Sequence, residues 1–203
     1  MTANVLDVQD LNVSFQTHAG IIQAVRGVSF GLAPGESLAI VGESGSGKSV
    51  TARAIMGLLP QNADVTGSIK YLDSSDYKET ELTTLPERQY RNIRGNKISM
   101  VFQDPMTCLD PTMTIGAQVA EPLRIHGVGR KDANKAAYDI LQAVGIPDTK
   151  QRMKQYPHQF SGGPRQSIAI AAALIAKPQI LLADEPTTAL DVRIQAQILD
   201  VLR

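Results

Sequence analysis

Polar and apolar residues alternate in the first part of the chain, as in β-strands that bury one face. The first strand is predicted from the spacing of Leu6, Val8, Leu11, Val13 and Phe15. Gly20 then punctuates the chain before a second strand over Ile21–Val28. The run Leu38–Val41 is apolar at every position, so we predict a strand buried on both faces in the middle of a parallel sheet. Thr66–Leu72 predicts a further strand.

Helical spacing of apolar residues dominates the later segments. We predict helices over Val50–Leu59, Ile115–His126, Lys131–Val144 and Gly163–Ala176, and another from Val192. Pro60 would stop the first of these helices, and Gly145 would stop the third. Two short strands are predicted within "SMVFQDP" and "ILLAD". The whole pattern is that of an α/β frame with an all-helical insertion.

The composition is that of an ordinary soluble globular protein. The 203 residues are 43% hydrophobic, and 20 basic side chains balance 20 acidic ones, so no overall charge points to nucleic acid. The longest apolar run, Ile168–Ala176, is far shorter than the roughly 20 residues that span a bilayer. The first residues have neither the basic patch nor the apolar block of a secretory signal. Cys108 is the single cysteine, which fits a reducing cytoplasm.

A glycine-rich loop carries the first chemical signal. "GESGSGKS", residues 42–49, has the spacing G-x-x-x-x-G-K-[ST] between a predicted strand and a predicted helix. Successive glycines let backbone N–H groups turn inward, and the helix adds the positive end of its dipole. Lys48 would reach the β- and γ-phosphates of a nucleotide, and Ser49 would hold Mg²⁺. The residues expected to bind the nucleotide here are Gly42, Glu43, Ser44, Gly45, Ser46, Gly47, Lys48, Ser49 and Val50.

A second signal is "ILLADEP", residues 180–186. Its apolar residues describe a buried strand that delivers Asp184 to the carboxyl end of the sheet, where open α/β sheets bind ligands. A carboxylate there can hold Mg²⁺, and by alternation Glu185 points to the other side, towards an attacking water. One carboxylate for the metal and one as general base favour a hydrolase over a kinase.

Three further sequence motifs accompany the glycine-rich loop and "ILLADEP". "FSGGPRQ" (160–166) places Ser161, Gly162 and Gly163 at a helix start, "VFQDP" puts Gln103 at a strand end, and "ALD" ends at Asp191. With the phosphate loop and "DEPTTALD", these motifs resemble the ATP-binding cassette (ABC) family over nearly the whole chain. "FQDPMTCLDPTMTIGAQVAEPLRIHG" and "DEPTTALDVRIQAQIL" look most like the ATPases of dipeptide, oligopeptide and nickel importers.

The resemblance implies one cassette domain over 1–203, of the P-loop NTPase type. It implies a core of 1–104 and 161–203 with an N-terminal antiparallel β subdomain, and a helical subdomain of 105–160. The cassette would hydrolyse ATP with Mg²⁺ and energise transport at the cytoplasmic face of the membrane. Its implied partners are a second ATPase subunit, identical or different, in head-to-tail arrangement, together with membrane permease subunits and a periplasmic or extracellular substrate-binding protein. No nucleic-acid partner is implied.

The resemblance also implies residue roles. Phe15 would stack on adenine, and Gln103 would sense Mg²⁺ and the γ-phosphate and couple them to the helical subdomain. Lys48, Gln103 and Glu185 would be catalytic, and the metal would be held by Ser49, Gln103 and Asp184. Ser161, Gly162 and Gly163 would contact the nucleotide of the opposite subunit, and Asp191 would bridge the two halves.

This sequence departs from the family pattern at several positions. Pro164 and Ser167 stand where relatives usually carry Gln or Met and a basic residue, and Phe160 replaces leucine. A proline is tolerated in the first turn of a helix, because its missing N–H has no helical partner there. The family's γ-phosphate histidine lies downstream of Arg203, and none of His18, His126 and His158 matches it. The resemblance therefore implies a cassette that lacks its last core strands.

Other functions stay open at this point. A soluble cassette ATPase of repair or translation is one, although such proteins tend to carry long insertions or duplicated cassettes. A small-molecule kinase or a GTPase would use the same loop, but "FSGGPRQ" and the absence of an N/T-K-x-D motif argue against both. A shortened cassette that binds ATP without supporting transport is the last. The transported substrate is not readable from the sequence.

Overall fold

The computed structural model describes residues 3–104 and 108–185. The chain divides into two units, Met1–Arg94 (unit 1) and Gly95–Arg203 (unit 2). The predicted frame of 1–104 and 161–203 and the predicted helical insertion of 105–160 use different boundaries, and that division stays a prediction. The helix expected from Val192 falls outside the described residues, as does Asp191.

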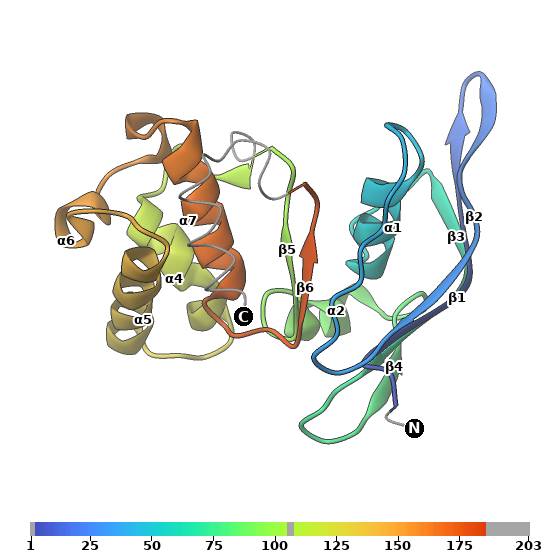
Figure 1. Cartoon of the computed structure of the whole chain (residues 1–203), viewed down its shortest axis with the longest axis horizontal. Helices are drawn as coiled ribbons and strands as arrows, with labels where there is room; N and C mark the ends of the chain where they lie inside the picture. Colours follow the sequence, from blue (N-terminus) through green and yellow to red (C-terminus); the bar gives the residue numbers. More distant parts are fainter. Residues whose placement is uncertain (1–2, 105–107, 186–203) are drawn as a thin grey trace. The chain divides into compact units, whose positions relative to one another are not determined.

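Unit 1 is built on an antiparallel sheet with strand order β2-β1-β3-β4 (Figure 1). The strands are β1 (Leu6–Thr17), β2 (Gly20–Leu32), β3 (Ala63–Leu72) and β4 (Glu79–Glu81). The three strands predicted in this part by alternation are present, and each is longer than predicted. The buried side chains of β1 and β3 form the core of the unit: Leu6, Val8, Leu11, Val13, Ile69 and Tyr71.

The prediction of a buried strand over Leu38–Val41 is wrong for this structure. The segment forms no strand, and the side chains of Leu38, Ile40 and Val41 are 45%, 47% and 92% exposed. A strand that is apolar on both faces needs hydrogen-bonded neighbours on both edges. Among the strands that the structure describes, none pairs with this segment, so its apolar residues have nothing to pack into.

The helices of unit 1 are α1 (Lys48–Ile55) and α2 (Glu87–Ile93). Helix α1 ends four residues earlier than the predicted Leu59. Gly57, with a φ of 59°, turns the chain into the left-handed region there. Its N–H donates to Ala54 O at 3.0 Å, and Leu58 N–H donates to Arg53 O at 2.9 Å. This is the Schellman pattern of hydrogen bonds, so Gly57 rather than Pro60 is the stop.

Unit 2 combines a two-stranded parallel sheet with a helical layer (Figure 1). Its elements are β5 (Ile98–Val101), α4 (Ile115–Ile125), α5 (Arg130–Ala143), α6 (Thr149–Arg152), the 3₁₀ helix η1 (Pro157–Gln159), α7 (Gly162–Leu174) and β6 (Ile180–Ala183). The predicted helices and strands of this part are confirmed, and most of their ends lie within two residues of the prediction. The predicted end of α5 at Gly145 is also confirmed, because Gly145 N–H and Ile146 N–H donate hydrogen bonds back to α5. Helices α4, α5 and α7 enclose one apolar core that includes Ile115, Val119, Leu141 and Ile168.

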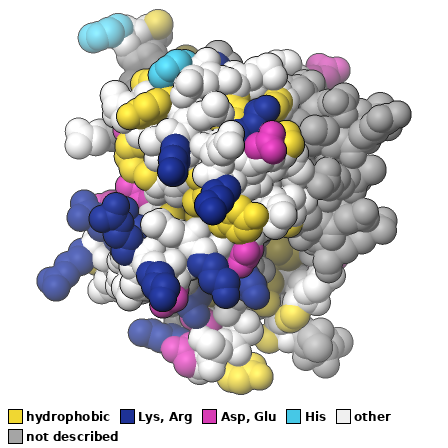
Figure 2. Space-filling model, turned by 90° about the vertical axis from the view of Figure 1, so that its left-hand side faces the viewer, with side chains coloured by type: hydrophobic (Ala, Val, Ile, Leu, Met, Phe, Trp, Pro, Cys, Tyr) yellow, Lys and Arg dark blue, Asp and Glu magenta, His cyan; other side chains and the backbone are white. Residues whose placement is uncertain are grey.

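The helical layer of unit 2 is positively charged. Residues 113–160 carry seven Lys and Arg against four Asp and Glu. Lys and Arg side chains gather on the face of these helices that Figure 2 shows. The seven cations are Arg124, Arg130, Lys131, Lys135, Lys150, Arg152 and Lys154.

Candidate functional site

The loop of residues 42–49 folds around the ammonium group of its own lysine. Lys48 Nζ donates to Gly42 O at 2.8 Å and to Glu43 O at 2.9 Å, and Ser46 N–H donates to Glu43 O. Lys48 and Ser49 are the first two residues of α1, so the positive end of the helix dipole and the lysine charge act at the same place. The loop is therefore arranged to receive an anionic group.

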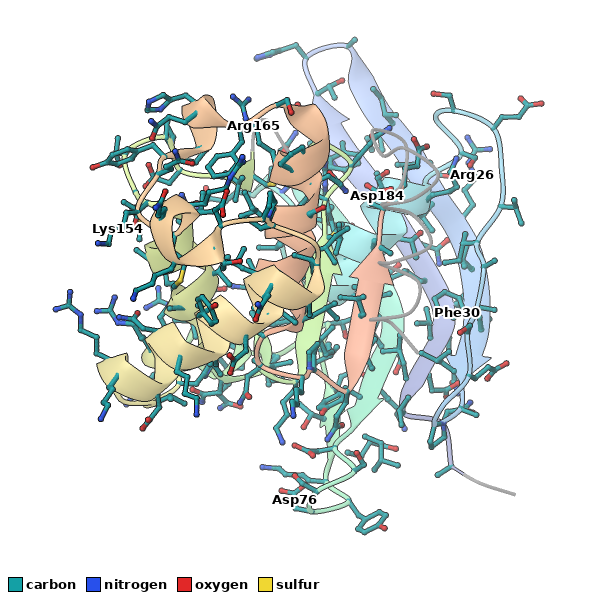
Figure 3. The ribbon with its side chains drawn as sticks, turned by 60° about the vertical axis from the view of Figure 1, so that its left-hand side comes forward. Arg26, Phe30, Asp76, Lys154, Arg165 and Asp184 are labelled. Atoms are coloured by element: carbon teal, nitrogen blue, oxygen red, sulfur yellow. The ribbon has the colours of Figure 1, made fainter. Side chains whose placement is uncertain are left out.

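The loop packs closely on strand β2 through Gly47. Gly47 has a φ of 93°, and a Cβ atom there would lie 2.5 Å from Ala24 O. Beside this contact an open hollow of about 520 Å³ is lined by loop residues and by Arg26 and Phe30. Arg26 and Phe30 both come from β2 (Figure 3). Two cations, Arg26 and Lys48, thus line one hollow, which suits a polyphosphate.

The other end of α1 is held by α2. The guanidinium of Arg94 donates through Nε to Met56 O at 2.7 Å and through Nη2 to Gly57 O at 2.8 Å. Its Nη1 bonds to Glu87 Oε1 at 2.8 Å, and it lies 4.6 Å above the ring of Tyr90. Tyr90 donates to Ile55 O, and burial raises the pKa of Tyr90 to about 12, so the hydroxyl stays protonated. These contacts hold the C-terminal end of α1, the helix whose first residues complete the loop of residues 42–49.

The second group of predicted residues meets at the carboxyl ends of β5 and β6. The strands run parallel with Val101 opposite Ala183, and Asp184 N–H continues the ladder to Val101 O at 3.0 Å. Gln103 Nε2 donates to Glu185 Oε2 at 2.9 Å, joining motifs that lie 82 residues apart in the sequence. Asp184 is buried at the tip of β6 (Figure 3), whereas Glu185 is exposed and has a φ of 49°. A non-glycine residue in that region is strained, which is common at functional sites.

Ser161, Gly162 and Gly163 lie at the start of α7. Ser161 is the residue before the helix, and a Cβ atom on Gly162 would meet no described residue within 4 Å. Pro164 lies in the first turn without disturbing it, as predicted, because the first helical hydrogen bond is the one from Arg165 N–H to Ser161 O. Ser167 is fully buried, and among the residues that the structure describes its hydroxyl has no hydrogen-bond partner.

The three residues predicted to hold Mg²⁺ have suitable chemistry. Ser49 offers a hydroxyl, Gln103 an amide oxygen and Asp184 a carboxylate, and Mg²⁺ prefers oxygen ligands. Ser49 belongs to unit 1, whereas Gln103 and Asp184 belong to unit 2. Within the described ranges, no group of three or more His, Cys, Asp and Glu side chains forms a metal site. That these three residues share one Mg²⁺ ion stays a prediction.

Phe15 was predicted to contact the nucleotide, whereas Arg26 was not. Phe15 is a half-buried residue of β1, paired with Ile22 and Ala63, and its contact with adenine stays a prediction. Arg26 was not predicted. The available signal was a single cation between Val25 and Val28 of a strand, next in space to a loop that the sequence places 16 residues further on.

Comparison with known proteins gives a family and several relatives. Residues 25–188 match the family model described as ABC transporter. The dipeptide transport ATP-binding protein DppD of Bacillus subtilis (strain 168) is 57% identical over 202 residues, which is 98% of this chain and 58% of that protein. The oligopeptide transport ATP-binding protein OppD of the same organism is 51% identical, over 98% of this chain and 54% of its own length. The chain thus spans little more than half the length of these relatives.

A solved structure shares the fold. The ATP-binding cassette MJ0796, in a dimeric post-hydrolysis state bound to ADP and Pi, matches with a TM-score of 0.83 and 30% identity. The match covers 97% of this chain and 81% of that one.

Proposed function

Because this chain belongs to the ABC transporter family, we propose that it is an ATP-binding and ATP-hydrolysing subunit of a peptide importer. The observation that carries this proposal is the contact between the Gln103 amide and the Glu185 carboxylate at 2.9 Å. It brings a candidate general base and a candidate water-orienting group together at the carboxyl ends of parallel strands, where α/β proteins bind ligands. A loop that only bound nucleotide would not need this pair.

Each residue has a role in the proposed reaction. The loop N–H groups and Lys48 bind the phosphates of ATP, and Arg26 adds a second cation in the same hollow. Ser49, Gln103 and Asp184 would hold Mg²⁺, which neutralises charge on the phosphate oxygens when bound. Glu185 accepts a proton from the attacking water while Gln103 orients that water. The oxygen–phosphorus bond to the γ-phosphate breaks as the water oxygen bonds to phosphorus, and the products are ADP and phosphate.

The partners follow from the relatives. Ser161, Gly162 and Gly163 would contact ATP bound by a second cassette, and the MJ0796 structure is described as dimeric. Names such as DppD and OppD support dipeptides or oligopeptides as cargo, carried by permease subunits and a substrate-binding protein. In the ranges the structure describes, no helix is long and apolar enough to cross a membrane. We place the chain at the cytoplasmic face of the membrane, held there by its permease.

One pair of variants tests the nucleotide chemistry. Lys48→Ala removes charge-assisted hydrogen bonds to phosphate, so it should weaken Mg·ATP binding by about 2–3 kcal/mol. Lys154→Ala is the matched control, because Lys154 is an exposed lysine of unit 2 (Figure 3). Titration calorimetry gives both affinities, and phosphate release gives turnover. Equal affinities for Lys48→Ala and the wild type would refute the proposal.

A further inference from the structure

Gln118 is a buried polar side chain of α4 to which the nucleotide chemistry assigns no part. It is 8% exposed. Its Oε1 accepts a hydrogen bond from Asp110 N–H at 2.9 Å, and its Nε2 donates to Asp110 O at 2.8 Å and to Met113 O at 2.9 Å. The amide oxygen and both amide hydrogens are therefore used, and all of them bind the backbone of one segment.

That segment follows Gln103 in the chain. Asp110 comes seven residues after Gln103, and Leu109 is buried in the helical core. The carboxylate of Asp110 accepts hydrogen bonds from Thr112 N–H at 2.7 Å and from Thr112 Oγ1 at 2.6 Å. The segment is thus fixed by one apolar and one polar anchor, whereas Gln103 itself is exposed and bonds to Glu185.

The first turn of α4 also contacts the segment that leads to Ser161. Ile115 N–H donates to Gln155 O at 2.9 Å, and Gly116 N–H donates to Met153 O at 3.0 Å. The approach at Gly116 is close, because a Cβ atom there would lie 2.8 Å from Met153 O. A few residues further on, Arg165 Nε in the first turn of α7 donates to Pro157 O at 2.8 Å.

We infer that Gln118 is a positioning residue that ties residues 110–113, which follow Gln103 in the chain, to the first turn of α4. Through that turn it links residues 110–113 to the segment before Ser161. The inference rests on the proposed function, in which Gln103 responds to ATP and Ser161 contacts the nucleotide of a second cassette. Gln118 is not among the residues assigned to the nucleotide. It makes the position of the segment before Ser161 depend on that of residues 110–113, because a buried amide whose hydrogen-bonding groups are all used holds its neighbours together.

The test compares Gln118→Met with Gln142→Met. Methionine has a similar volume and removes the hydrogen bonds, and Gln142 is an exposed glutamine on α5. Amide hydrogen exchange is followed on the full chain with and without Mg·ATP, and Mg·ATP affinity is measured by calorimetry. Without nucleotide, Gln118→Met should speed exchange at Asp110 by about tenfold or more, because its N–H loses its partner. Exchange in the core of α7 should stay as in the wild type.

The response to nucleotide separates a coupling role from a merely structural one. In the wild type and in Gln142→Met, Mg·ATP should slow exchange both near Gln103 and over residues 153–165. In Gln118→Met, affinity should stay within about twofold and the change near Gln103 should remain, while the change over 153–165 is lost. Normal binding with an undiminished change over 153–165 in Gln118→Met would overturn this inference alone. Absence of Mg·ATP binding in the wild type would overturn the proposed function, and this inference with it.

Discussion

Gly47 is the residue at which the phosphate loop has no room for a side chain. It combines a φ of 93° with a backbone carbonyl, that of Ala24, 2.5 Å from where a Cβ atom would lie. Gly45 in the same loop also has a positive φ, of 82°, but a Cβ atom there would meet nothing within 4 Å. Both glycines thus have a backbone conformation that disfavours a side chain, but only Gly47 is also closely packed against another strand.

We expect Gly47→Ala to weaken Mg·ATP binding much more than Gly45→Ala does. Both changes strain the backbone by roughly 1–2 kcal/mol, but only Gly47→Ala also forces the loop away from β2. Calorimetry on both variants measures the difference, and circular dichroism checks that each is folded. Similar affinities for the two variants would mean that the loop does not depend on its packing against β2.

Residue identities were predictable where a short motif carries the chemistry, and not where three-dimensional contacts create it. Lys48, Asp184 and Glu185 could be named as candidates from local spacing alone. Arg26 and Gln118 were not, because a lone cation in a strand and a lone amide in a helix become informative only when their neighbours are known. The contact between Gln103 and Glu185 depends on the register of β5 against β6, and no local pattern encodes that register.

Helix α1 shows how an element is held at both ends. Its N-terminus forms the loop, and its last carbonyls, with those of Met56 and Gly57, are bonded by Tyr90 and Arg94 of the α2 segment. A cation at this end also complements the helix dipole. The planar guanidinium presents separate N–H groups, held in a rigid plane, to two carbonyls and to Glu87, whereas an ammonium group offers its donors from a single nitrogen.

Arg94→Lys should therefore destabilise the protein although it keeps the charge. Loss of charged hydrogen bonds to Met56 O and Gly57 O should lower the free energy of unfolding by about 1.5–3 kcal/mol. Urea unfolding followed by circular dichroism measures this, since the chain has no tryptophan. Arg91→Lys is the control, because Arg91 is 75% exposed and its contact with Glu87 is 3.6 Å long. If both variants lower the free energy of unfolding equally, the planar geometry of the Arg94 guanidinium is not the cause.

Element prediction succeeded for segments whose pattern is satisfied locally. The amphipathic helices α4 and α5 and the strand β1 bury the faces that their periodicity indicated. The segment Leu38–Val41 has an equally clear pattern, yet a strand apolar on both faces depends entirely on neighbouring strands. The apolar pattern indicates that the segment needs neighbouring strands, but it does not show whether those strands are present. The stop of α1 at Gly57 was missed because Pro60 is the stronger breaker by residue type.

At the scale of the whole molecule, the proposed function predicts an assembly. Glu185→Gln keeps the side-chain volume and removes the base, so hydrolysis should slow by roughly 10²–10⁴-fold while ATP stays bound. The variant should then accumulate in an ATP-dependent dimer, twice the monomer mass of 21.9 kDa. Size exclusion with light scattering measures the mass, and phosphate release measures the rate.

The double variant Lys48→Ala with Glu185→Gln provides the control for that assembly. Without nucleotide binding it should remain a monomer in the presence of Mg·ATP. If Glu185→Gln binds ATP with wild-type affinity and stays monomeric, the head-to-tail arrangement does not hold for this chain. If Glu185→Gln releases phosphate as fast as the wild type, Glu185 is not the general base.

The hydrogen bond between Gln103 and Glu185 has a consequence for the order of events in the proposed reaction. The Gln103 amide donates to Oε2 of Glu185, so one of the two carboxylate oxygens is already engaged in a hydrogen bond. In the proposed reaction Gln103 orients the attacking water, so its amide would leave the Glu185 carboxylate before that oxygen accepts the proton of the water. We therefore expect a rotation of the Gln103 side chain to precede each round of hydrolysis.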